Sequence, residues 1–108
     1  MRTAEIFMHG RKAGLLIEIG ENKQYRFSYF NAYDGPPISV RMPIGEGTFT
    51  YDRFPPFFEG LLPEGVNLEH LLKVRKIDRN DLFAQLMAIG EDTVGAVTVH
   101  AVTEEPVS

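Results

Sequence analysis

The chain has 108 residues, 44% of them hydrophobic, which suits one globular domain with its own core. It contains no cysteine, so disulfides, zinc–thiolate sites and cysteine nucleophiles are excluded. The formal net charge of -4 argues against a nucleic-acid-binding domain, because such domains usually carry a basic excess or a basic stripe.

The first half of the chain predicts β-strands. Three strands are expected, at residues 4–9, 13–19 and 24–30, with short turns between them. In the third strand, aromatic residues at positions 25, 27 and 29 alternate with polar residues, which is the period of a half-buried strand. The short connections favour an antiparallel meander.

Residues 34–37, Asp-Gly-Pro-Pro, form a strong break, after which two shorter extended segments are expected. The first, at residues 38–42, would place Ile38, Val40 and Met42 on one side. A Gly-Glu-Gly turn then leads to a strand at residues 48–51.

The second half of the chain predicts helices. A short helix is expected after Asp52, which would cap it, and before Pro63, which would end it. A second helix is expected at residues 66–76. Its apolar stripe would consist of Leu68, Leu71 and Leu72, extended by the stem of Arg75.

A third helix is expected at residues 81–89, capped by Asp78 or Asn80 and stopped by Gly90. Its buried face would consist of Leu82, Phe83, Leu86 and Met87.

A valine-rich strand at residues 94–102 should pair with an earlier strand, and residues 103–108 should form a flexible tail. The sequence therefore predicts a single domain at residues 1–102. Its fold class is α+β, with an antiparallel-rich sheet of about five strands and two to three helices packed on one side.

Residues 57–64, Phe-Phe-Glu-Gly-Leu-Leu-Pro-Glu, are the most unusual segment of the chain. Four large apolar side chains crowd into six positions, and only Glu59 offers the polar face that a helix of a lone domain normally carries. We expect a second protein to cover part of this segment. The candidate contacts are Phe57, Phe58, Leu61, Leu62, Pro63 and Glu64. The alternative is that these residues fill the core of this domain, and Glu64 has the further alternative of a capping role.

Motifs for catalysis or cofactor binding are not found. His9, His70 and His100 are too far apart in sequence for a helical metal motif, and no serine lies in a nucleophile elbow. The Gly-Glu-Gly turn lacks the rest of a phosphate-binding fingerprint. No apolar run approaches the length of a membrane span, and the first residues lack the pattern of a signal peptide. We expect a cytoplasmic protein without a cofactor.

Two motifs resemble one family. Residues 57–64 resemble the Phe-Phe-x-x-Leu-Leu-Pro-acid motif of the HipA-type kinases, and residues 89–99 resemble the Ile-Gly-x-Asp-Ser/Thr-x-Gly-Ala-Val segment that follows it. The interval between the motifs also matches, and residues 37–43 are similar to the family's Pro-Leu-Ser-x-x-x-Pro. The resemblance extends from about residue 7 to residue 99.

The resemblance implies a role without catalysis. In HipA-type toxins this region is the N-terminal subdomain, and the ATP loop and catalytic aspartates belong to a kinase core that this chain does not include. In split members of the family the subdomain is a separate small antitoxin, HipS, encoded with a kinase toxin, HipT, and a DNA-binding protein, HipB. The resemblance implies that this chain binds and inhibits a HipT-like serine/threonine kinase, in a complex that also holds a HipB-like protein.

Two alternatives remain open. The chain is an accessory fragment of a full-length HipA-type kinase, or it binds a small ligand or a nucleic acid. Binding of a nucleic acid would require Tyr25, Phe27 and Tyr29 to be exposed for stacking on bases. Such residues more commonly belong to the core of a domain.

Overall fold

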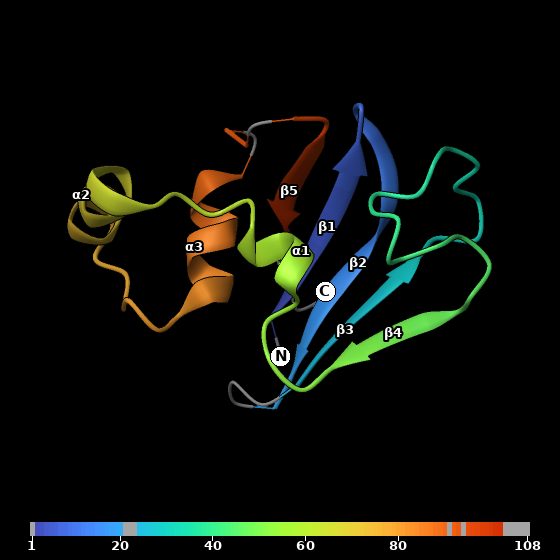
Figure 1. The fold of residues 1–108 in the computed structure, drawn as a ribbon, viewed down its shortest axis with the longest axis horizontal. Helices are drawn as coiled ribbons and strands as arrows, with labels where there is room; N and C mark the ends of the chain where they lie inside the picture. The colour runs from blue at the N-terminus through green and yellow to red at the C-terminus, as the bar shows by residue number, and fades with distance from the viewer. Residues whose placement is uncertain (1, 21–23, 91, 94, 103–108) are drawn as a thin grey trace, which may run out of the picture.

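A five-stranded antiparallel sheet forms the body of the protein in the computed structural model, which describes residues 2–20, 24–90, 92–93 and 95–102 (Figure 1). The spatial order of the strands is β4-β3-β2-β1-β5. The strands are β1 (Thr3–Met8), β2 (Arg11–Ile19), β3 (Gln24–Tyr29), β4 (Thr48–Tyr51) and β5 (Val97–Ala101). The helices are α1 (Pro56–Glu59), α2 (Gly65–Arg75) and α3 (Leu82–Ile89).

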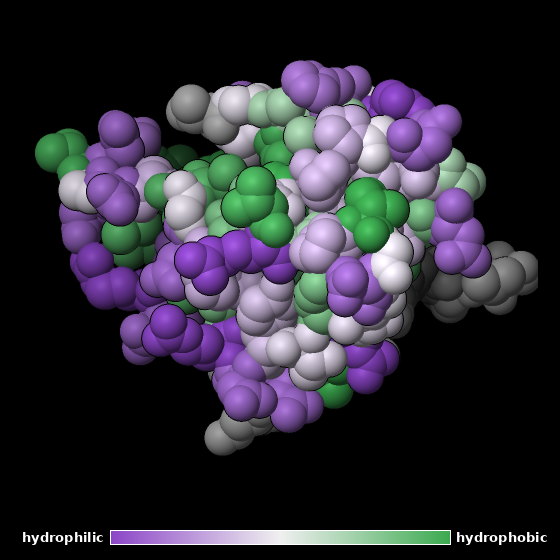
Figure 2. Space-filling model, turned by 45° about the vertical axis from the view of Figure 1, so that its right-hand side comes forward, coloured by the Kyte–Doolittle hydropathy of each residue, from purple (hydrophilic) through white to green (hydrophobic). Residues whose placement is uncertain are grey.

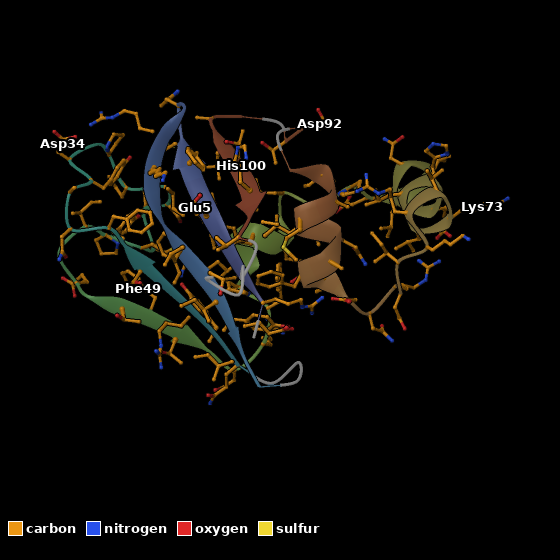
Figure 3. All side chains as sticks on the ribbon, turned by 180° about the vertical axis from the view of Figure 1, so that it is seen from behind. Glu5, Asp34, Phe49, Lys73, Asp92 and His100 are labelled. Atoms are coloured by element: carbon orange, nitrogen blue, oxygen red, sulfur yellow. The ribbon has the colours of Figure 1, made fainter. Side chains whose placement is uncertain are left out.

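Alternation along the strands divides the sheet into a buried and an open face. Leu16 on β2 pairs with Ala4 on β1 and Phe27 on β3, and all three are fully buried. The neighbouring positions point the other way and are half-buried or exposed. Figure 3 shows the sheet from the open side, where no described helix covers it.

The core lies between the buried face of the sheet and two of the helices. Phe58 of α1 and Phe83 and Leu86 of α3 are fully buried there. In contrast, α2 buries no residue completely and lies beyond α3, at the far end of the molecule from β4 (Figure 1). The expected α+β fold, an antiparallel sheet with helices on one side, is confirmed.

The strand expected at residues 38–42 does not form. Ile38 and Met42 are buried, as an alternating pattern requires, but Val40 between them is 92% exposed. The backbone turns here, because the Met42 N–H donates to the Ser39 carbonyl oxygen at 3.0 Å. The Tyr29 hydroxyl accepts from the Ile38 N–H at 2.9 Å and donates to the Met42 carbonyl oxygen at 2.5 Å. These bonds to a side chain replace the backbone ladder that a strand would need.

The starts of two helices differ from the expected ones. Helix α1 has Pro55 at its N-cap, so Asp52 lies too far upstream to cap it. Helix α3 is capped by Asp81, whose side chain accepts from the Ala84 N–H at 3.1 Å. Asp78 instead accepts from the Asn80 N–H at 2.8 Å, which forms a turn before the helix. Neither expected cap of α3 is therefore the cap.

The apolar stripe of α2 is only half-buried. It consists of Leu68, Leu71 and Leu72, and Arg75, although exposed, lines the same small groove as Leu71. On α3, Leu82 and Met87 are half-buried and pack against the core without joining its buried centre. The predicted tail at residues 103–108 and the start of the predicted last strand at Val94 lie outside the described residues.

Candidate partner-binding surface

The segment at residues 57–64 connects α1 to α2. Pro55 adopts an extended conformation with φ -60° and ψ 131°, and Pro56 then starts α1. Proline suits this position because the N–H that it lacks would have no acceptor within the helix. Beyond the helix, the N–H groups of Leu61 and Leu62 donate to the carbonyls of Phe58 and Glu59, both at 3.1 Å. The segment thus continues as a compact turn.

Phe58 is a core residue. Its side chain is fully buried, and its ring centroid lies 5.8 Å from that of Phe27 on the sheet. It has no surface to offer to a partner, so its position matches the alternative role in the domain's own core.

Phe57 lies at the surface beside it. This side chain is half-buried and lines a groove of about 850 Å³. The groove is also bordered by Met42 and Tyr51 and by two arginines, Arg41 and Arg53. Phe57 is therefore the aromatic residue of the segment that remains accessible from solvent.

Leu61, Leu62 and Pro63 are half-buried. The two leucines pack against the hydrophobic core, and Pro63 borders a second, smaller groove of about 300 Å³ between α2 and α3. Figure 2 shows the side of the molecule on which β4 comes forward. There, apolar residues form separate patches divided by polar ones. The segment thus spans the region between two grooves.

Glu64 is exposed and stands at the N-cap position of α2, but its side chain makes no capping hydrogen bond. Within the described part of the chain it has no ion pair either. The capping role considered for Glu64 is therefore absent, and its carboxylate is available to a partner's cation.

Arg41 and Arg53 border the groove beside Phe57 and were not among the contacts expected from the sequence. Both are exposed, and neither forms an ion pair with any described residue. They come from two segments that meet only in the fold, next to Phe57. In the sequence, each of these arginines precedes an apolar residue that is followed by proline, as Arg41-Met42-Pro43 and Arg53-Phe54-Pro55. That shared pattern is the feature that could have pointed to them.

The aromatic residues of β3 do not form a stacking platform for bases. Tyr25 is 5% exposed and Phe27 is fully buried, and the hydroxyl of half-buried Tyr29 is engaged with the turn at residues 38–42. Burial also raises the pKa of Tyr25 and of Tyr29 above the ordinary value. Among the described residues, no cluster of three or more His, Asp or Glu side chains is placed to hold a metal. None of the described helices has the length and apolar character needed to cross a membrane.

Comparison with known proteins gives consistent results. The family model described as "HipA N-terminal domain" matches residues 4–100. A solved structure, "N-terminal domain of HipA toxin", superimposes with a TM-score of 0.77 at 32% identity, covering 97% of this chain and 96% of that one.

Two curated relatives differ greatly in length. An uncharacterized protein of Haemophilus influenzae is 34% identical over 100 residues, which are 93% of this chain and 92% of that protein. The serine/threonine-protein kinase toxin HipA of Shewanella oneidensis is 36% identical over 63 residues, which are 58% of this chain but 14% of the toxin. The similarity in both sequence and fold is thus to the N-terminal domain of such toxins, and the chain belongs to the HipA N-terminal domain family.

Proposed function

We propose that this chain acts in the cytoplasm as a non-enzymatic antitoxin that binds a HipT-like serine/threonine kinase and inhibits it. The observation that carries the proposal is the family assignment, combined with the Haemophilus relative. That relative matches along 92% of its own length, so a protein of this size need not carry a kinase core.

The surface between the two grooves suits such a role. Phe57 offers a large apolar side chain at the border of the larger groove, and Pro63 borders the smaller one. Buried aromatic anchors commonly dominate the affinity of protein interfaces. Leu61 and Leu62 would add apolar area between the grooves, and Glu64 would pair with a cation of the kinase. Phe58 supports this surface from inside and makes no direct contact.

Co-expression tests the proposal. A HipT-like kinase from the same genome is expressed with and without this chain, and growth and co-purification are measured. We expect the kinase alone to arrest growth, and the chain to restore growth and to co-purify with the kinase. A HipB-like protein added to the same cells should join the complex. Arrested growth despite abundant chain, with no co-purification, would contradict the proposal.

The match to the Shewanella HipA toxin supports a second candidate, an N-terminal accessory domain of a longer kinase. The two candidates differ in the size of the native protein. An immunoblot of the source cells with an antibody against this chain should detect a species of 12.2 kDa under the antitoxin proposal. A band of the size of a whole kinase, without the small species, would favour the accessory domain.

A further inference from the structure

The groove beside Phe57 lies along an edge of the sheet. Strand β4 pairs with β3 alone among the described strands, so its other side presents unpaired backbone groups. Successive residues of a strand point to opposite faces, yet both Thr50 and Tyr51 line this groove. The groove therefore lies against β4, the strand whose open edge an added extended segment would use.

The groove combines an apolar floor with a local excess of positive charge. Tyr51, Pro56 and Phe57 supply the apolar surface, above the buried Met42. Arg41 and Arg53 stand against one acidic residue of the lining, Asp52, and neither arginine is neutralised by a described ion pair. In a chain whose net charge is -4, this lining has the opposite sign. Such a surface favours an acidic occupant over a basic or neutral one.

We infer that this groove binds an extended, acidic segment of the partner kinase that carries one large apolar side chain. The segment lies along β4 and exchanges backbone hydrogen bonds with its open edge, which is a common mode of peptide recognition. Its carboxylates pair with Arg41 and Arg53, and its apolar side chain enters the groove beside Phe57. The volume of about 850 Å³ is ample for that side chain. The inference rests on the proposed binding of a kinase and states which chemistry of the kinase is recognised.

Charge reversal tests it, with the purified HipT-like kinase as the probe. The variant Arg41→Glu/Arg53→Glu reverses both charges of the groove. The matched control, Lys73→Glu/Lys76→Glu, reverses two other exposed cations without described ion pairs. Lys73 lies on α2 at the far end of the molecule from β4 (Figure 3). Thermal unfolding of both variants verifies that the fold is retained.

We expect calorimetric titration to give a Kd at least about tenfold weaker for the groove variant and within about twofold of wild type for the control. Arg41→Lys/Arg53→Lys, which keeps the charge, should recover most of the affinity. Added salt should weaken the wild-type complex more than the complex of the groove variant. Equal affinities of the groove variant and the control would overturn the groove inference and leave the antitoxin proposal standing. A wild-type chain that does not bind the kinase would overturn both.

Discussion

Phe57 and Phe58 are consecutive residues whose rings meet edge to face, with centroids 5.1 Å apart, but one ring lies at the surface and the other in the core. Phe58 is fully buried in the core, and Phe57 borders the groove at β4. Adjacent residues of an α-helix point about 100° apart, so one residue of α1 faces the core and the next one faces solvent.

Alanine substitutions should separate the two roles. Phe58→Ala removes a fully buried aromatic ring and should lower the free energy of unfolding by about 3–5 kcal/mol. Phe57→Ala should lower it by about 1 kcal/mol and weaken kinase binding by about 2 kcal/mol, or roughly 30-fold. Urea unfolding and calorimetry measure the two quantities. If Phe57→Ala binds the kinase like wild type, Phe57 is not an anchor.

A partly buried ion pair joins Arg2, just before β1, to Glu18 on β2. Arg2 donates to both carboxylate oxygens of Glu18 at 2.7 Å, and the Glu18 side chain is only 8% exposed. Arg2→Met would break the ion pair of Arg2 with Asp81 at 2.9 Å as well. It would also leave the Glu18 carboxylate buried, with the Tyr25 hydroxyl at 3.4 Å as its remaining described partner. We expect a loss of about 3 kcal/mol, at the lower end of the range for a broken buried pair because Arg2 is partly exposed.

The matched control for Arg2 is Arg79→Met. It removes an ion pair with Glu69 in which both side chains are more than half exposed. That pair should contribute less than about 1 kcal/mol. Urea unfolding measures the free energy of unfolding of the two variants. Equal losses would show that the burial of Glu18 does not make its ion pair more stabilising than the exposed one.

Stability should fall in acid through Asp81. Burial acts to raise the pKa of this carboxyl, but the hydrogen bond from Arg2 and the capping N–H of Ala84 outweigh burial and hold the pKa below its ordinary value. A lowered pKa in the folded state stabilises the fold at pH values above the unfolded-state pKa of about 3.9. That contribution is lost as the pH falls through the folded-state pKa.

Asp81→Asn keeps an acceptor for the cap and removes the charge. The difference in unfolding free energy between wild type and this variant should be largest above about pH 5 and should shrink toward pH 2. Urea unfolding across this pH range measures it. A difference that stays constant with pH would show that the charge on Asp81 does not stabilise the fold.

Gly14 on β2 has no room for a side chain. A Cβ built there would overlap the Ser28 carbonyl oxygen and lie 2.9 Å from Cζ of the Phe27 ring. Gly14→Ala should therefore cost about 1–3 kcal/mol through forced displacement of β3. At Gly60, with φ -66°, a Cβ would meet its nearest neighbour at 3.4 Å. Gly60→Ala should be neutral or slightly stabilising in thermal unfolding. Equal losses at the two glycines would contradict this packing.

The sequence predicted the sheet because its strands follow a local rule. Alternation at residues 24–30 requires only that one face be buried, and β3 forms there. The same rule failed at residues 38–42, where the Tyr29 hydroxyl takes up the Ile38 N–H and the Met42 carbonyl. That interaction joins residues that are separated in sequence, and no periodicity within 38–42 indicates it.

The candidate site was predictable only in part. The apolar density of residues 57–64 marked the segment as a candidate, but it could not distinguish buried Phe58 from accessible Phe57, because that depends on how α1 is oriented on the sheet. Arg41 and Arg53 escaped prediction for a different reason. The groove that they border is assembled from two stretches of the chain, residues 39–42 and 50–57, and it exists only after the sheet and α1 have packed.

Inhibition of a kinase is measured by titrating a purified HipT-like kinase with the purified chain and following the activity of the kinase. Phosphate transfer is followed at a fixed concentration of kinase, with the Phe57→Ala variant as the control. Kinase activity should fall to background near one equivalent of wild-type chain, and the variant should require a large excess. Full kinase activity in the presence of a tenfold excess of folded wild-type chain would contradict the proposed inhibition.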